Sequence, residues 1–262
     1  LAGVFTINAP ALAARMRDIV LAMAALYFVY LFTLAGLTTD EKKRVAVIVV
    51  LFVFATIFWS AFEQAPTSLN LFARDFTDRQ IGGFEVPSTW FQSVNSGFII
   101  LLSPLFAALW MTLGRRGIDL SSPAKFAMGL LLAGIGFWMM IGAANIILEG
   151  GPGTRVSAWW LVGSYFFQTL GELFLSPVGL SSMTKLSPRK YVGQMMGIWF
   201  LATAVGNLIA GLAGGHIDPE RLEQMPRLFT LTTVSLMAAA AVLALLIIPI
   251  RRMIATTRSA QL

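Results

Sequence analysis

The stretch from Phe58 to Arg79, FWSAFEQAPTSLNLFARDFTDR, decides the fold of this chain. An apolar run leads into it from Val45, and the stretch then carries a single carboxylate, Glu63, followed three residues later by Pro66. An ionised side chain inside a bilayer costs about 3 to more than 10 kcal/mol. A glutamate at this place therefore needs a functional or structural reason.

Composition places the chain in a membrane. The sequence is 57% hydrophobic and 12% charged, whereas soluble domains carry about 25% charged residues. The net charge of +6 falls in short connectors, which argues against a nucleic-acid-binding face. The absence of cysteine and the single histidine, His216, exclude disulfides and leave metal or triad chemistry without partner residues. Because the chain begins at Leu1, we expect it to be cut from a longer protein.

Apolar stretches of membrane-spanning length recur along the whole chain. A transmembrane helix needs about 20 largely apolar residues. The qualifying stretches are 14–37, 45–71, 86–113, 124–148, 157–184, 191–214 and 228–250. The sequence therefore predicts an all-α integral membrane protein with spanning helices over these ranges.

The basic residues of the connectors predict the orientation, because cytoplasmic loops carry an excess of lysine and arginine. Twelve of them fall at one set of helix ends: Lys42, Lys43, Arg44, Arg115, Arg116, Lys125, Lys185, Arg189, Lys190, Arg251, Arg252 and Arg258. Seven fall at the other: Arg15, Arg17, Arg74, Arg79, Arg155, Arg221 and Arg227. The richer side, with the C-terminus, is predicted to be cytoplasmic.

Two carboxylates lie deep inside predicted spans. The chain has thirteen acidic residues, but only Glu63 and Glu172 fall well within a span, and no lysine or arginine does. Burial without a partner favours the neutral form of a carboxylate, whereas a nearby cation favours the charged form. A glutamate that alternates between these states carries a proton. The alternative is a permanently neutral, hydrogen-bonded glutamate with a structural role.

Helix-breaking prolines lie about one turn from both acids. Pro177 follows Glu172 and Pro66 follows Glu63, and each leaves a carbonyl of the preceding turn without its usual N–H partner. Ser176 and Gln168 share the helical face of Glu172. Irregular backbone of this kind lines cavities in transporters.

Other polar and small residues in the spans have a structural interpretation. Asn95, in the third span, can form an interhelical hydrogen bond worth about 0.6 kcal/mol. The pairs Gly193/Gly197 and Gly211/Gly215 have the spacing that permits close approach of helix backbones.

Four motifs in order resemble the proton-dependent oligopeptide transporters of the major facilitator superfamily. The run FWSAFEQ from Phe58 resembles their seventh transmembrane helix, WFQSVN from Trp90 their eighth, GELFLSP from Gly171 their tenth and GIWF from Gly197 their eleventh. Ala65-Pro66 departs from the glutamine or glycine and small residue that many relatives place after the glutamate. The resemblance covers nearly the whole chain.

The resemblance implies a C-terminal six-helix bundle preceded by one extra transmembrane helix. Residues 1–44 would be the extra inter-domain helix and its linker, and residues 45–262 the bundle of helices seven to twelve. The N-terminal half would lie outside this sequence. The family also implies a bacterial inner membrane, a multi-pass monomer with lipid around it, protons as the coupling ion, no other cofactor and no nucleic acid.

Site residues also follow from the resemblance. Glu172 would pair with the amino terminus of a peptide, Asn95 would hydrogen-bond the same end, and Ser176 would lie beside them. Glu63 would be the protonatable residue facing an arginine of the N-terminal half. Side-chain pockets would be shaped by Trp59, Phe62 and Trp199.

The expected function is proton-coupled symport of di- and tripeptides by alternating access. The alternative is a related carrier of another small solute such as nitrate, an amino acid or a drug. An intramembrane enzyme is disfavoured because no His/Cys metal set is present. A non-transporting scaffold would leave the two acids at proline bends without a purpose.

Overall fold

The computed structural model describes residues 8–118, 120–215 and 223–258. Its long helices, in chain order, are α1 (Ala9–Thr33), α2 (Thr39–Phe62), α4 (Gln92–Arg115), α5 (Ser122–Gly150), α6 (Trp159–Leu186), α7 (Val192–Gly215) and α8 (Gln224–Arg258). Each contains most of one predicted span, so the all-α membrane fold is confirmed. His216 and Arg221 lie outside the described residues.

Short elements close the end of the bundle opposite the C-terminus. The 3₁₀ turn η2 (Ser88–Phe91) leads into α4, and η3 (Arg189–Tyr191) leads into α7 at the other end. Strand β1 (Thr77–Asp78) pairs in parallel with β4 (Val156–Ser157), and β2 (Gln80–Ile81) pairs antiparallel with β3 (Phe84–Glu85). The β1–β4 pair joins the connector before α4 to the connector before α6.

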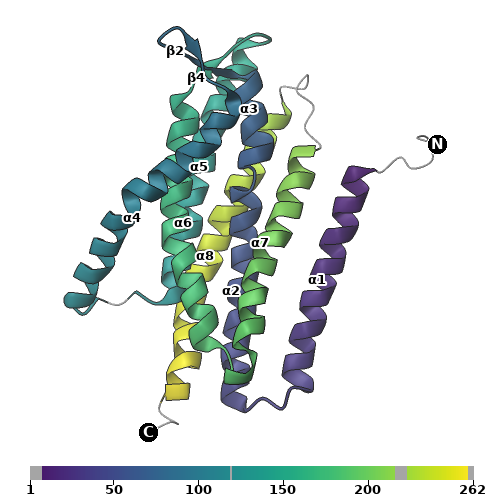
Figure 1. Ribbon diagram of the computed structural model, residues 1–262, viewed down its shortest axis with the longest axis vertical. Coiled ribbons are helices and arrows are strands. Elements are labelled where there is room, and N and C mark those ends of the chain that lie inside the picture. Colours follow the sequence, from purple (N-terminus) through teal and green to yellow (C-terminus); the bar gives the residue numbers. More distant parts are fainter. Residues whose placement is uncertain (1–7, 119, 216–222, 259–262) are drawn as a thin grey trace.

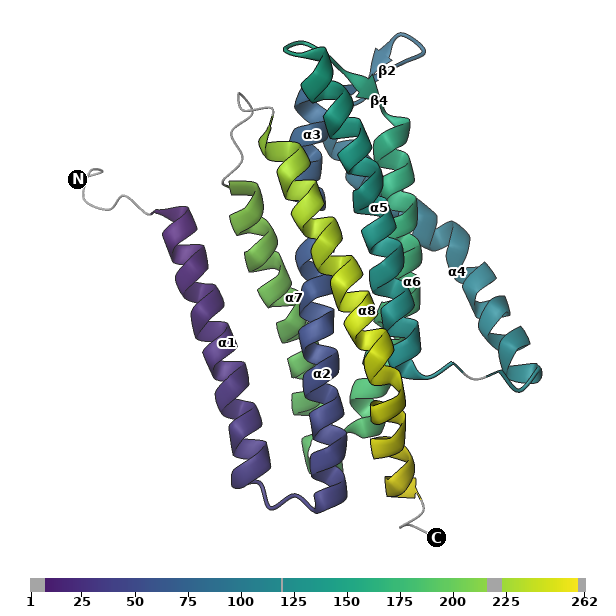
Figure 2. The same ribbon diagram turned by 180° about the vertical axis from the view of Figure 1, so that it is seen from behind.

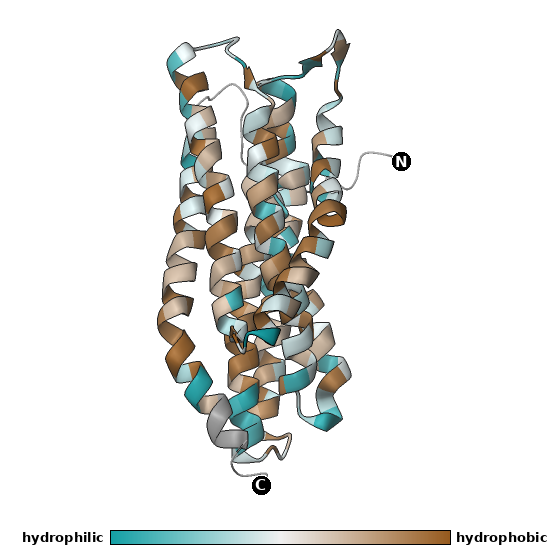
Figure 3. Cartoon of the chain, turned by 90° about the vertical axis from the view of Figure 1, so that its left-hand side faces the viewer, coloured by the Kyte–Doolittle hydropathy of each residue, from teal (hydrophilic) through white to brown (hydrophobic). Residues whose placement is uncertain are grey.

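Six segments among the described residues are long and apolar enough to cross a membrane. Helix α6 is equally long, at 28 residues, but its polar Gln168 and Glu172 lower its mean hydropathy. In Figure 3 the hydrophilic colour gathers towards the two ends of the bundle, and the long helices between them are mostly hydrophobic or neutral. The connectors richest in lysine and arginine lie in the half of the bundle that carries the C-terminus (Figure 1).

A central group of helices carries the core. Helix α5 packs against α6 and α8, and α2 packs against α7, α8 and α6. Five phenylalanines are fully buried between them: Phe58, Phe72, Phe126, Phe137 and Phe229. Helix α1 stands at one edge beside α7, and α4 leans away from α6 at the other (Figures 1 and 2). Helix α4 has no fully buried residue, and apart from the face that meets α6 its surface is exposed in this chain.

Helix α2 begins earlier than its apolar run. Thr38 and Glu41 form a capping box, in which the Thr38 hydroxyl accepts from the Glu41 N–H at 3.3 Å and the Glu41 carboxylate accepts from the Thr38 N–H at 2.9 Å. This satisfies two of the free N–H groups at a helix start. The helix therefore begins at Thr39, six residues before the range predicted from hydropathy.

The predicted span over 45–71 is confirmed, and its helix changes geometry beside Glu63, where Pro66 predicted irregular backbone. The α-helix ends at Phe62 with Glu63 as its C-cap, a π-helical turn η1 (Ala65–Leu69) contains Pro66, and α3 (Asn70–Asp75) completes the span. Proline has no N–H to continue an α-helical ladder, and π turns frequently mark functional sites. In contrast, α6 continues through Pro177.

The glycines that allow close helix packing are not the predicted pairs. A Cβ added at Gly193, Gly197, Gly211 or Gly215 would meet nothing within 4 Å. On α7 the close contacts belong instead to Gly206, where a Cβ would lie 2.5 Å from Trp59 Cβ, and to Gly214, where it would lie 2.6 Å from Thr67 Cβ. Spacing alone did not identify which face of the helix meets a neighbour.

The tightest backbone contact lies between α5 and α6, next to Glu172. A Cβ at Gly171 would lie 2.6 Å from the Gly129 carbonyl oxygen. We expect Gly171→Ala to force the two helices apart and to lower the stability of the fold by about 1–3 kcal/mol. The melting temperature of the detergent-solubilised protein measures this effect.

The matched control is Gly114→Ala at the end of α4, where an added Cβ meets nothing within 4 Å. Alanine favours a helix over glycine by up to about 1 kcal/mol. The control should therefore melt no lower than the unchanged protein. An equal melting temperature for Gly171→Ala would contradict the packing argument.

Candidate functional site

Asn95 and Glu172, predicted separately from two spans, meet between α4 and α6. The Asn95 Nδ2 group donates to Glu172 Oε2 at 3.2 Å and to Thr169 Oγ1 at 2.9 Å. The Thr169 hydroxyl is buried and donates to the Tyr165 carbonyl oxygen at 2.7 Å. Asn95 is thereby held by two groups of α6, and Glu172 receives one hydrogen bond.

Glu63, predicted from the second span, caps the end of α2 and is partly buried. Helix α2 packs against α6, the helix that carries Glu172.

No cation of this chain pairs with either acid in the described residues. The salt bridges found there are Arg17–Asp18, Lys43–Asp40, Arg74–Asp75 and Arg79–Glu85, and none of them includes Glu63 or Glu172. The site in the described residues is thus the Glu172 carboxylate with the Asn95 amide and the Thr169 hydroxyl, and Glu63 lies at the end of the adjacent helix α2. A carboxylate in this setting can bind an ammonium group or take up a proton.

Ser176 and Gln168, the other polar residues of α6 predicted to lie beside Glu172, differ in their exposure. Ser176 is partly exposed one turn beyond Glu172. Gln168 is only 1% exposed and donates to Ser164 at 2.9 Å within the same helix. A Cβ at Gly136 would lie 3.2 Å from Gln168 Cγ. Gln168 therefore faces α5 in the interior of this half, although it shares a helical repeat with Glu172.

The three aromatic residues predicted for side-chain pockets are mostly packed within this chain. Trp59 contacts the ring of Phe62 at 5.3 Å between centroids, and Phe62 is the more exposed of the two. Trp199 is 2% exposed, because its ring fills the space beside Gly179 and meets Phe126 edge-on at 6.2 Å. The visible role of Trp199 is helix packing, and its role in a substrate pocket stays a prediction.

The charged residues at the end of the stretch 58–79 form ion pairs within and just after α3. Arg74 makes a bidentate contact with Asp75, at 2.7 and 2.9 Å. Arg79 pairs with Glu85 at 2.5 Å and donates to the Val86 carbonyl oxygen at 2.7 Å. The contacts of Arg79 therefore link the two ends of the connector between α3 and α4, whereas the Arg74–Asp75 pair lies within α3.

Two features of the site region were missed from the sequence. Thr169 lies three residues before Glu172, and this spacing would have placed it on the same face. Around the π turn, Gln64 Nε2 donates to Thr232 Oγ1 at 3.1 Å, and Ser68 Oγ donates to Gln64 Oε1 at 2.8 Å. No local signal in the sequence links Gln64 to Thr232, because 168 residues separate them.

Comparison with known proteins identifies a single family. The model of the POT family matches residues 15–228. The chain is 48% identical over 259 residues to the peptide transporter YePEPT of Yersinia enterocolitica subsp. palearctica, covering 99% of this chain and 50% of that protein. It is 39% identical over 170 residues to dipeptide and tripeptide permease A of Proteus mirabilis, covering 65% and 34%.

Solved structures agree with the sequence comparison. A crystal structure of a peptide transporter POT in complex with sulfate superposes with a TM-score of 0.85 at 33% identity, over 96% of this chain and 49% of that one. The chain spans about half the length of the relatives it matches over its whole extent.

Proposed function

This chain belongs to the POT family, and from that premise we propose that it is the C-terminal half of a proton-coupled symporter of di- and tripeptides. In this proposal residues 1–44 supply an extra helix and linker, and residues 45–262 supply the six-helix bundle. The N-terminal half completes the peptide site against the open face of α4. The names of the relatives, a peptide transporter and a dipeptide and tripeptide permease, support the substrate class.

The observation that carries the proposal is the hydrogen-bonded pair of Asn95 and Glu172 without a cation in the described chain. A dipeptide is a zwitterion, so its site needs an anionic and a cationic end. This chain supplies the anion, and a cation from the other half would complete the site. Repeat-built transporters hold their substrates at the interface of the two repeats.

The proposed chemistry uses this chain's residues as follows. The Glu172 carboxylate binds the ammonium group of the peptide, and Asn95, held by Thr169, orients that carboxylate. Glu63 takes up a proton at its carboxylate and so loses its attraction for an arginine of the other half. Ser176 contacts the peptide beside Glu172, and Trp59, Phe62 and Trp199 shape the walls around peptide side chains.

The proposed setting is the bacterial inner membrane, with the transporter as a monomer and the C-terminus in the cytoplasm. The excess of lysine and arginine at the end that carries the C-terminus supports this orientation. Protons are the proposed coupling ion. No further cofactor and no enzymatic step is part of the proposal.

Uptake of a labelled dipeptide into liposomes under an imposed proton gradient tests the function. The complete transporter, which is this chain together with the N-terminal half, should accumulate dipeptide when the gradient points inward. A panel of competing solutes, including nitrate, single amino acids and a drug-like amine, should compete poorly. Accumulation of one of these in place of dipeptide would overturn the substrate assignment.

Thr169 gives a finer test of the site. We expect Thr169→Val to raise KM for dipeptide about three- to twentyfold, because a membrane hydrogen bond is worth about 0.6 to 1.7 kcal/mol. The maximal rate should change less, since Glu172 remains. Thr184→Val is the matched control, because the Thr184 hydroxyl bonds only to carbonyls of its own helix. An equal KM in both variants would show that Asn95 needs no support from Thr169.

A further inference from the structure

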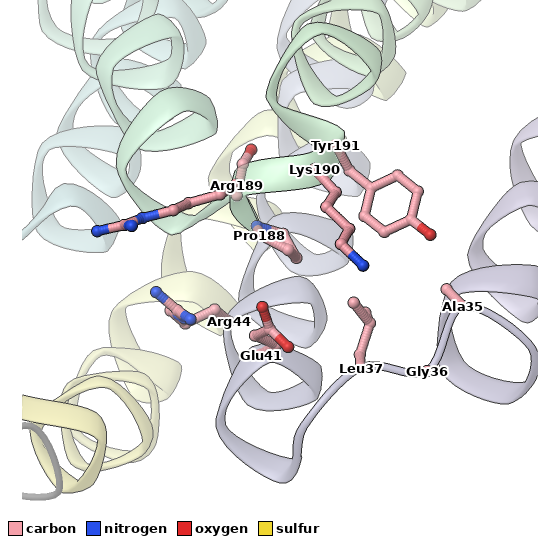
Figure 4. Close-up of a pocket in the computed structure, with 10 residues that line it drawn as sticks. Ala35, Gly36, Leu37, Glu41, Arg44, Pro188, Arg189, Lys190 and Tyr191 are labelled. Atoms are coloured by element: carbon pink, nitrogen blue, oxygen red, sulfur yellow. The ribbon is translucent and has the colours of Figure 1, made fainter.

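A cavity separate from the acidic site lies at the end of the bundle that carries the C-terminus. It has a volume of about 390 Å³, within the range of about 300–1,000 Å³ typical of small-molecule sites. Its walls come from the α1–α2 connector, the start of α2 and the turn η3 (Figure 4). It therefore lies where the extra helix meets the six-helix bundle.

Positive charge dominates the lining of this cavity. Arg44, Arg189 and Lys190 line it, and Glu41 is its carboxylate. Glu41 Oε2 is engaged by Thr38, whose N–H and hydroxyl donate to it at 2.9 and 3.0 Å. None of the three cations forms a salt bridge with another described residue. With three cations and one carboxylate, the lining of the cavity carries a surplus of positive charge.

Arg44 gives an independent sign that an acceptor is missing. Its Nε atom is buried and has no hydrogen-bond partner. A buried N–H without an acceptor destabilises a fold, so such groups usually meet a ligand, an ion or water. The planar guanidinium fork matches the geometry of phosphate oxygens, and lysine adds a compact charge.

The remaining walls suit a ligand at the surface of a bilayer. Leu37 and Pro188 give an apolar side. Tyr191 forms another wall, with its hydroxyl 3.5 Å from the Tyr30 hydroxyl of α1. Tyrosine is enriched at the membrane–water interface, and basic pockets between transmembrane helices bind lipid head groups.

We propose that this cavity binds a phosphate-bearing anion, which neutralises Arg44 and Lys190 and holds α1 against the bundle. The phosphate belongs either to an anionic lipid of the surrounding bilayer or to a soluble phosphate ester. The site is distinct from Glu63 and Glu172 and does not require peptide transport.

Thermal stabilisation of the complete transporter in phosphatidylcholine nanodiscs tests the proposal with two probes. One arm adds phosphatidylglycerol to the nanodisc lipid, and the other adds glycerol 1-phosphate to the buffer. We expect a saturable rise in melting temperature, and Arg44→Gln/Lys190→Gln should raise the half-saturating concentration by at least about tenfold. Saturation with the lipid alone assigns the phosphate to the bilayer, and saturation with both probes assigns it to soluble esters as well.

Matched variants keep the test decisive. Arg115→Gln/Arg116→Gln removes the same charge from another connector at the same end of the bundle, and its half-saturating concentration should stay unchanged. Lys190→Gln alone, at an exposed position, replaces the double variant if that protein does not fold. No saturable response to either probe, or equal weakening in the control, would overturn the proposal. Since binding is measured without peptide, this outcome is separate from any failure of transport.

Discussion

Dipeptide uptake should fall by at least about thirtyfold in Glu172→Gln, because removing one partner of a buried charge pair costs about 2–5 kcal/mol. Glutamine keeps the shape of the side chain and can still accept from Asn95, so the fold should be retained. What it loses is the negative charge that binds the peptide ammonium group. Measured binding of unlabelled dipeptide should weaken together with transport.

Glu149→Gln is the matched control for this substitution. Glu149 is an exposed carboxylate near the end of α5, away from the Asn95 pair. Its variant should transport at the rate of the unchanged protein. If Glu172→Gln bound and transported dipeptide normally, Glu172 would have only the structural role of a hydrogen-bonded acid.

Glu63→Gln is expected to abolish coupling to protons, whereas Glu172→Gln is expected to abolish peptide binding. Glu63→Gln fixes the side chain in a neutral state, like the protonated glutamate, so a proton gradient can no longer change it. Proton-driven accumulation of dipeptide should be lost, while exchange of labelled for unlabelled peptide across the membrane should persist. Comparing the two assays in one preparation separates coupling from binding.

Loss of exchange in Glu63→Gln would instead assign Glu63 to the peptide site. Retained proton-driven accumulation would remove it from the coupling mechanism altogether. Glu149→Gln again serves as the control and should behave normally in both assays. These outcomes are distinct from those at Glu172, where binding itself is expected to fail.

Most of the fold was predictable because lipid imposes a simple rule on sequence. Each span needs a long apolar run, and the runs found by length contain most of each observed helix. The helix ends were less predictable. Helix α2 starts at Thr39, just before the charged run Asp40–Arg44, and its start is fixed by a capping box, which hydropathy does not measure. Similarly, Pro66 predicted a bend, but hydropathy could not predict the π turn that follows it.

The residues of the candidate site were likewise predictable only in part. Glu63, Glu172 and Asn95 were identified because polar residues inside a span are costly and therefore rare. Thr169 and the Gln64–Thr232 contact were missed, because hydroxyls are common in membrane helices and usually bond to their own backbone. The close glycines were also missed, since spacing places a residue on a face but does not identify the neighbour of that face.

The pairing of β1 with β4 has a mechanical consequence. It hydrogen-bonds the connector that follows α3 to the connector that precedes α6. Movement of α3 at this end should therefore be coupled to movement of α6. At the opposite end, α4 and α1 lack any such strand pairing in the described chain. Bending of this half should therefore be concentrated at the end that carries the C-terminus, with the strand-paired end acting as the stiff pivot.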